Sequence, residues 1–296
     1  MTIFEQQLRR MKQDKGFIAA LDQSGGSTPK ALTGYGIQEN AYKNEDEMYG
    51  LIHAMRSRVL TDKSFTGDKI LGVILFEKTL NAKVEGMPTT EYLWKKHIVP
   101  FLKIDKGLEE KKNDVQLMKP IPNLAGIIQD AKSKGVFGTK MRSVIFANNQ
   151  AGIAAVVQQQ FEFARIIIEN GLVPIIEPEV DIHAADKKEI EATLKAALLE
   201  QLNKLTANQN VMLKLTLPAE NNFYSDLTTH PQVVRVVALS GGYDFEKATN
   251  LLANNKNVIA SFSRALLDDL RVDQTTEQFS TVLSKAIDGI YNASIT

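Results

Sequence analysis

A lysine interrupts one of the most apolar stretches of the sequence. The segment VMLKLTL, residues 211–217, has the composition of a buried β-strand except at Lys214. Burying an unpaired ammonium group costs so much free energy that the group tends to lose its proton. A neutral amine can attack a ketone or aldehyde, and the resulting iminium accepts the electrons of an adjacent carbon–carbon bond as it breaks. Lys214 is a candidate for this chemistry, although a lysine that extends its side chain to water would give the same pattern.

Two pairs of charged residues would assist such a lysine. Glu177 and Glu179 lie near the end of one apolar stretch, and Lys140 and Arg142 near the end of another. Because strand side chains alternate between two faces, the members of each pair share a face. An iminium forms by loss of water from a carbinolamine, so a carboxylic acid–base such as either glutamate is needed. The two cations would favour a neutral amine nearby, or form a structural ion-pair network with the glutamates.

Asp22 ends the first apolar stretch and is a candidate for a second acid–base group, near the bond that breaks. It precedes Ser24, Gly25 and Gly26. An aspartate before serine and glycine is also ordinary turn chemistry. The argument for chemistry therefore rests on the whole set of charged residues and not on Asp22 alone.

Eight short apolar stretches must position these residues. They are residues 16–22, 70–77, 98–105, 137–145, 172–180, 211–217, 233–240 and 257–263. Between them, helical spacing of apolar residues occurs in 44–60, 124–135, 149–168, 184–205, 244–255 and 275–291. This alternation predicts an α/β protein with a (β/α)8 TIM barrel, in which the carboxyl ends of the strands converge on one mouth. A doubly wound sheet would give a similar pattern, but no Gly-x-Gly-x-x-Gly opens a helix.

No proline-, glycine- or serine-rich linker divides the chain, so we predict one catalytic domain over residues 1–296. The charged segment KGLEEKKND, residues 106–114, is predicted to be a solvated loop. In a barrel, the loops after the seventh and eighth strands often bind phosphate through backbone N–H groups. Here these loops contain LSGG, residues 239–242, and SFSRA, residues 261–265, in which Arg264 would add a forked cationic contact. Lysine, carboxylates and phosphate loops together indicate a Schiff-base aldolase of a sugar phosphate.

Composition limits the classes of partner. With 35 basic and 35 acidic residues the formal net charge is zero, so neither a nucleic acid nor a membrane surface is expected. The chain has no cysteine, which excludes disulfides and thiolate metal sites and suits a reducing cytoplasm. Its four histidines fit no ligand spacing, so we expect neither metal nor cofactor. The first 16 residues lack a signal-peptide core, and we predict a cytoplasmic protein.

Eight motifs, spread in order over almost the whole length, match a known pattern. They read ALDQSGGSTPKAL, FLKIDKG, QLMKP, FGTKMRS, GLVPIIEPEV, VMLKLTLP, VVALSGG and SFSRAL. With them the chain resembles the class I fructose-bisphosphate aldolases, the metal-independent Schiff-base family, in a short bacterial-type version. The resemblance implies reversible cleavage of fructose 1,6-bisphosphate to dihydroxyacetone phosphate and glyceraldehyde 3-phosphate, in glycolysis and gluconeogenesis. A stereoisomer such as tagatose bisphosphate would suit the same motifs, and a homo-oligomer is compatible with them.

The resemblance assigns catalytic roles by position. Lys214 matches the Schiff-base lysine, and Glu177, with Glu179 beside it, matches the acid–base of the carbinolamine steps. Lys140 matches the second active-site lysine, and Asp22 the aspartate implicated in bond cleavage. The residues matched to substrate and phosphate binding are Arg142, Ser240, Gly241, Ser261 and Arg264, with Ser24, Ser27 and Lys103 around the far phosphate.

Two other classes of protein compete with this interpretation. A non-enzymatic barrel that binds phosphosugars could keep the phosphate loops, but it would not need the lysines and carboxylates together. A zinc-dependent aldolase would need clustered histidine or thiolate ligands, which the sequence does not show.

The chain departs from the longer animal-type enzymes of the family at three places. Ala31 stands where those enzymes have an arginine, and Ser263 stands where they have a glycine before the phosphate arginine. The chain also ends in NASIT, without the terminal tyrosine that assists proton exchange on the enamine. Tyr291 could take that role, but its spacing favours a position in a helix core.

Overall fold

A closed barrel of eight parallel strands forms the centre of the molecule in the computed structural model, which describes residues 1–296. The strands are β1 (Phe17–Leu21), β2 (Ile70–Leu75), β5 (Val99–Lys103), β7 (Gly138–Ile145), β8 (Val173–Val180), β9 (Val211–Thr216), β10 (Val233–Leu239) and β11 (Val258–Phe262). Each pairs in parallel with the next, and β11 pairs with β1 to close the ring. All eight predicted strands and the TIM-barrel prediction are confirmed.

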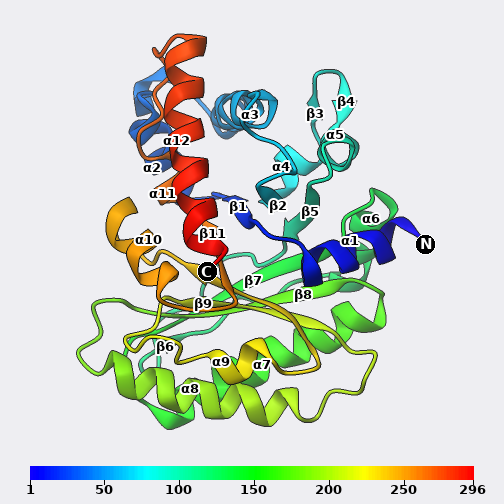
Figure 1. The fold of residues 1–296 in the computed structure, drawn as a ribbon, viewed down its shortest axis with the longest axis vertical. Coiled ribbons are helices and arrows are strands. Elements are labelled where there is room, and N and C mark those ends of the chain that lie inside the picture. The colour runs from blue at the N-terminus through cyan, green and yellow to red at the C-terminus, as the bar shows by residue number, and fades with distance from the viewer.

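Helices cover the outside of the barrel. The long ones are α1 (Ile3–Gln13), α2 (Ser27–Tyr35), α3 (Glu45–Thr61), α6 (Leu124–Ser133), α7 (Gln150–Glu169), α8 (Lys187–Leu202), α10 (Phe245–Ala253) and α12 (Thr276–Ser294). The short ones are η1 (Glu39–Ala41), α4 (Glu77–Leu80), α5 (Thr89–Lys95), α9 (Ser225–Thr228) and α11 (Arg264–Leu267). Figure 1 shows α7 and α8 along one side of the barrel and α12 with α3 along another. All six predicted helices are present, and α1, α2 and the five short helices were not predicted. None of the helices is long and apolar enough to cross a lipid bilayer.

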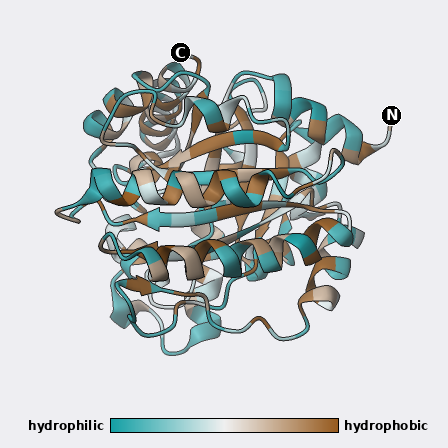
Figure 2. Cartoon of the chain, turned by 90° about the horizontal axis from the view of Figure 1, so that it is seen from below, coloured by the Kyte–Doolittle hydropathy of each residue, from teal (hydrophilic) through white to brown (hydrophobic).

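Two apolar layers hold these elements together. A cluster of 66 buried residues fills the space between strands and helices, and a second cluster of 14 fills the barrel interior. The alternation of strand side chains explains the division. On β9, for example, Leu213 and Leu215 belong to the outer layer, whereas Met212 belongs to the inner one. Figure 2 shows strands with brown segments behind helices that alternate between brown and teal, and one strand in the middle of the view is largely teal.

Three small strands lie outside the barrel. β3 (Lys83–Val84) and β4 (Met87–Pro88) form an antiparallel hairpin, and β6 (Val115–Gln116) pairs antiparallel with the end of β7. The segment 106–114 is mainly exposed, as predicted, and leads into β6 through isolated bridges. Tyr291 is half-buried on α12 and packs against the outer apolar layer, as predicted from its spacing.

Candidate active site

Three ionisable side chains of the predicted site share the interior of the barrel at its carboxyl end. Lys214 lies on β9, Glu177 on β8 and Lys140 on β7. They are only 3–4% exposed, so Lys214 does not reach water in the manner of a surface lysine. Asp22, directly after β1, approaches them from the other side of the barrel. Because each strand alternates its side chains, these residues point inward while their chain neighbours pack against the helices.

A continuous chain of ion pairs joins the four groups. Lys214 Nζ lies 3.0 Å from Glu177 Oε1, and Lys140 Nζ lies 3.1 Å from Glu177 Oε2. Lys140 Nζ also lies 2.8 Å from Asp22 Oδ2. Glu177 therefore stands between two ammonium groups, and Lys140 connects it to Asp22 across the barrel.

A third carboxylate in this cluster, Asp105, was not assigned to the site from the sequence. It is 7% exposed, and its two oxygens lie 3.1 Å from Lys103 Nζ and 3.7 Å from Lys140 Nζ. Its place after an apolar stretch was visible in the sequence, but no pattern distinguished it from an ordinary charged strand end. Lys140 is thus surrounded by three carboxylates.

The charges decide the protonation states of the buried groups. Burial raises the pKa of Asp22 and of Glu177, but the ammonium groups of Lys140 and Lys214 outweigh burial and hold both pKa values below the usual range. Burial lowers the pKa of Lys140, but the surrounding carboxylates outweigh it and raise this pKa above its usual range. At neutral pH Glu177 is therefore ionised and can accept a proton, while Lys140 stays cationic.

The backbone pairing between β8 and β9 ends beside the pair of Lys214 and Glu177. The paired register of these strands extends to Ile176 with Leu213, directly below Glu177. Beyond it, the hydroxyl of Thr216 takes over the backbone contacts: it accepts from Val180 N at 2.9 Å and donates to Val180 O at 2.8 Å. Thr216 of β9 therefore still connects to Val180 of β8 beyond the point where their backbone pairing ends. Lys214 and Glu177 lie in the barrel at this level.

Arg142 and Glu179 form their own ion pair at the mouth of the barrel. Burial lowers the pKa of Arg142, but the carboxylate of Glu179 outweighs it and raises this pKa further above its usual range. The Arg142 side chain is 37% exposed, so part of its guanidinium faces the open cleft. Glu179 is engaged with Arg142 and not with Lys214, which distinguishes it from Glu177.

All thirteen residues predicted for the site line one cleft of about 1020 Å³ at this mouth. On one side lie Ser240 and Gly241 after β10, and Ser261 and Arg264 at the end of β11 and the start of α11. Gly241 has φ 63°, and a Cβ there would lie 2.6 Å from Ile182 Cγ2, so the turn requires glycine on both counts. The Ser261 hydroxyl is buried without a hydrogen-bond partner, and is a polar group available to a ligand.

The other side of the cleft is formed by the loop after β1 and the end of β5. Lys103 Nζ donates to Ser24 Oγ at 2.7 Å, and Ser27 Oγ donates to the Ser24 carbonyl at 2.8 Å. Ala31 also lines this side, without a charge to replace the arginine of longer enzymes. The cationic side chains of Lys30 and Lys106 border the same region.

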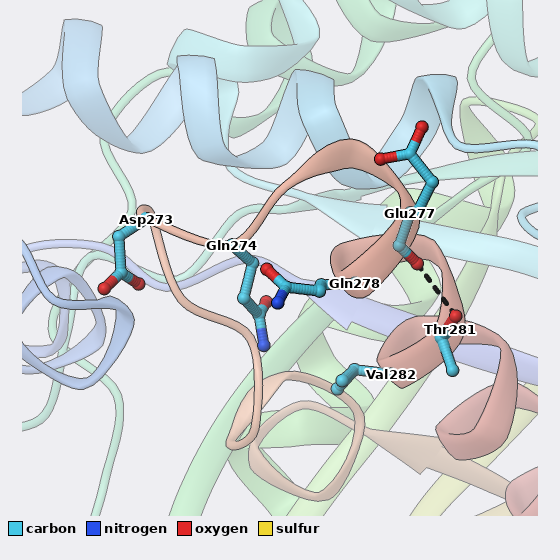
Figure 3. Close-up of a pocket in the computed structure, with 6 residues that line it drawn as sticks. All are labelled: Asp273, Gln274, Glu277, Gln278, Thr281 and Val282. Carbon is cyan, nitrogen blue, oxygen red and sulfur yellow. Dashed lines mark hydrogen bonds between the residues drawn. The ribbon is translucent and has the colours of Figure 1, made fainter.

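A second hollow, of about 540 Å³, lies at the start of α12 (Figure 3). The residues that line it are Asp273, Gln274, Glu277, Gln278, Thr281 and Val282. None belongs to the predicted site, and Thr281 Oγ1 simply donates to the Glu277 carbonyl at 2.8 Å within the helix. No group of three or more His, Cys, Asp or Glu side chains anywhere in the chain is arranged to hold a metal ion.

The geometry can be compared with known proteins. A family model described as fructose-bisphosphate aldolase class-I matches residues 5–225. The chain belongs to the class I fructose-bisphosphate aldolase family. It is therefore an aldolase-type enzyme, an aldehyde-lyase. The match includes Lys214 and Glu177, whereas the turns with Ser240 and Arg264 lie beyond it.

Two solved structures have a fold similar to that of this chain. A fructose-bisphosphate aldolase from Plasmodium falciparum, determined in complex with TRAP and a small-molecule inhibitor, is 22% identical with a TM-score of 0.75. The alignment covers 99% of this chain and 95% of that one. A protein from Corynebacterium glutamicum is 14% identical with a TM-score of 0.57, over 98% of this chain and 92% of that one. Because the sequence identity is low in both cases, these similarities show a shared barrel fold.

Proposed function

We propose that this aldolase cleaves fructose 1,6-bisphosphate reversibly to dihydroxyacetone phosphate and glyceraldehyde 3-phosphate, through a Schiff base on Lys214. The observation that carries the proposal is the buried pair of Lys214 Nζ and Glu177 Oε1 at 3.0 Å, beneath a cleft that has serine- and glycine-containing turns and Arg264 on one side. The cleavage serves glycolysis, and the reverse condensation serves gluconeogenesis. Because the substrate is a cytoplasmic metabolite, we place the enzyme there, in agreement with a sequence without cysteine.

The first steps join the amine to the substrate ketone. Glu177 is ionised and takes a proton from the Lys214 ammonium, so the free electron pair of the amine attacks the carbonyl carbon. Glu177 then returns the proton to the hydroxyl of the carbinolamine, which leaves as water and gives an iminium. The ammonium of Lys140, 3.1 Å from the same carboxylate, stabilises the negative charge that develops on the carbonyl oxygen.

The next step breaks the carbon–carbon bond. Asp22 accepts the proton of the substrate hydroxyl, the hydroxyl carbon becomes the aldehyde, and the bonding electrons move to the iminium to form an enamine. Lys140 holds the Asp22 carboxylate at 2.8 Å, and therefore fixes its place between the two halves of the cleft. Protonation of the enamine and hydrolysis of the Schiff base by water complete the turnover.

The two halves of the cleft suit two phosphates. We assign the ketone-side phosphate to the turns with Ser240, Gly241 and Arg264, together with the unpartnered hydroxyl of Ser261. The far phosphate would contact Ser24, with Ser27 and Lys103 nearby, and Arg142 would contact the substrate through its exposed edge.

Borohydride trapping tests the proposal directly. Reduction in the presence of dihydroxyacetone phosphate should inactivate the enzyme, and mass mapping should place the adduct on Lys214. Activity should survive EDTA. Loss of activity on chelation with recovery on zinc addition would refute the Schiff-base mechanism. Parallel assays with tagatose 1,6-bisphosphate test the stereochemical part of the proposal, and faster cleavage of that isomer than of the fructose isomer would refute it.

A further inference from the structure

Arg56 is a buried cation that the mechanism above does not use. It lies on α3 among the apolar residues that face the core, and its residue exposure is 0%. It forms no salt bridge within 4 Å, although buried charges in proteins are nearly always paired. Because burial without an ion pair is costly, a particular set of contacts has to hold this guanidinium.

The contacts of Arg56 join three loops at the mouth of the barrel. Its Nη1 donates to Thr79 Oγ1 at 2.7 Å, on α4 after β2. Its Nη2 donates to Gln23 O at 2.5 Å and to Gln23 Oε1 at 3.2 Å, in the loop after β1. The amide of Gln23 donates in turn to Ser263 Oγ at 2.6 Å, in the loop after β11. One arginine is therefore connected to the loops of three neighbouring strands.

The charge that balances Arg56 is that of Asp22, one residue before Gln23. Burial lowers the pKa of Arg56 to about 10, and the Asp22 carboxylate opposes this change. A pKa near 10 leaves the guanidinium protonated at neutral pH. Arg56 thus carries a full positive charge close to Asp22. It also donates two hydrogen bonds to Gln23, the residue that follows Asp22 in the chain.

Ser263 is the residue through which Gln23 contacts the loop after β11. It stands directly before Arg264, where the longer relatives have glycine, and its hydroxyl accepts the Gln23 amide at 2.6 Å. The loop that carries the candidate bond-cleaving group is therefore attached to the turn that carries the candidate phosphate arginine. A displacement of Gln23 would move both.

We propose that Arg56 is a positioning residue of this aldolase, which acts through Gln23 to hold Asp22 against Lys140 and the Ser263–Arg264 turn at the edge of the cleft. This inference rests on the proposed function, because it assigns to Asp22 the cleavage step and not the formation of the Schiff base. The lysine–glutamate pair lies on β8 and β9 and has no contact with Arg56. Loss of Arg56 should therefore slow bond cleavage and leave adduct formation intact.

The experiment compares these two steps in Arg56→Met, which has similar length and no donors. The turnover number for fructose 1,6-bisphosphate cleavage should fall by about 10–100-fold, since a misplaced catalytic group costs on the order of 10²-fold. Borohydride trapping is measured at saturating dihydroxyacetone phosphate, because a displaced Arg264 turn should weaken binding of its phosphate. Its maximal rate should stay within about threefold of the parent, because Lys214 and Glu177 are untouched. Arg56→Lys keeps the charge without the fork and should recover part of the lost turnover.

Arg235→Met is the matched control. Arg235 also donates to backbone carbonyls, those of Met11 at 2.8 Å and Asp14 at 3.1 Å, but at the opposite end of the barrel. It should lower the melting temperature and leave the turnover number and KM unchanged. If Arg56→Met lowers cleavage and trapping equally, or changes neither at a temperature where it is folded, Arg56 is only structural and the proposal is wrong.

A double-mutant cycle covers the case in which Arg56→Met does not fold. Gln23→Leu and Ser263→Ala each remove one partner of the hydrogen bond between the loops after β1 and β11. If this hydrogen bond positions the catalytic groups, the effects of the two substitutions on kcat/KM should be non-additive. Additive effects would overturn the proposal. If the parent enzyme neither cleaves nor traps its substrate, the proposed function fails, whatever the variants show.

Discussion

Met212 and Lys214 lie on the same face of β9, two residues apart, in opposite environments. Met212 is buried among apolar side chains that fill the barrel, and Lys214 is buried among ion pairs at the carboxyl end. The change from one environment to the other takes place over about 7 Å of strand, since a strand rises about 3.3 Å per residue. The barrel interior therefore combines an apolar core and the candidate reaction site on the same strands.

The amino end of the barrel is closed by α1. Phe4, Leu8 and Met11 of this helix pack against the inner apolar cluster, and the ring of Phe4 lies 5.1 Å from that of Phe137. A capping box at Thr2 starts the helix, and Arg235 of β10 donates to the carbonyl of Met11. These contacts stabilise the fold, and none of these residues lines the cleft at the carboxyl end.

The carboxyl end concentrates charges that would be costly elsewhere in the interior. Each buried cation there has a carboxylate partner or, for Arg56, a set of oxygen acceptors. Such ends of barrel strands are open to loops, and the cleft lies among them. The difference indicates that changes at the amino end should affect stability, and changes at the carboxyl end should affect chemistry.

Lys214→Arg should have the largest effect. A guanidinium stays protonated and cannot attack the ketone, so both cleavage and borohydride trapping should fall below detection. The control is Lys187→Arg on α8, because Lys187 also pairs with a buried glutamate, Glu191, but outside the cleft. Circular dichroism verifies folding. Trapping at the parent rate in Lys214→Arg would move the nucleophile to Lys140.

Glu177→Gln should slow adduct formation while the lysine remains present. A general acid–base group contributes about 10²–10⁴-fold, and the amide keeps the shape without accepting the proton. Single-turnover trapping measures the effect, and Glu191→Gln, at a second buried lysine–glutamate pair, is the control. Because Arg142 holds Glu179, we expect little substitution by that residue. An unchanged rate would make Glu179 or Asp22 the next candidate.

Arg264→Ala should mainly weaken phosphorylated substrates. A hydrogen bond to a charged group is worth about 1.5–3 kcal/mol, which corresponds to about 10–150-fold in kcat/KM. Non-phosphorylated analogues should lose little, and serve as the internal control. Equal losses with both kinds of substrate would show that Arg264 supports the turn and does not bind phosphate.

Met11→Ala should have the smallest effect on activity and tests the amino end. Removing a fully buried methionine below the barrel should lower the free energy of unfolding by about 2–5 kcal/mol. The turnover number and KM, measured well below the melting temperature, should stay those of the parent. A loss of activity without a loss of stability would show that the two ends of the barrel are coupled.

The fold could largely be predicted because its signals are local. The run predicted at 211–217 forms a strand over Val211–Thr216, and the run at 16–22 forms one over Phe17–Leu21. The helix predicted over 184–205 starts later, at Lys187, since residues 181–186 form turns. The extra pairs, β3 with β4 and β6 with β7, were missed because two-residue strands carry no periodic pattern.

The candidate site was predicted less completely. Thirteen residues were expected at one cleft and all line it, but Asp105, Gln23 and Arg56 were absent from the prediction. Arg56 lies in a helix that also carries Arg58, and an arginine in such a helical pattern resembles a surface residue. Its partner Gln23 is 33 residues away, and Gln23 meets Ser263 across 240 residues.

The sequence by itself determined the alternation of strands and helices, and with it which side chains of each strand share a face. These properties follow from apolar periodicity and from the two-residue repeat of a strand, which need no knowledge of distant residues. Only the tertiary structure decided that Lys214 pairs with Glu177, that Lys140 is shared by three carboxylates, and that Arg56 pairs with none. The energy of a charge depends on atoms a few ångströms away, and closure of the barrel brings those atoms from strands far apart in the chain.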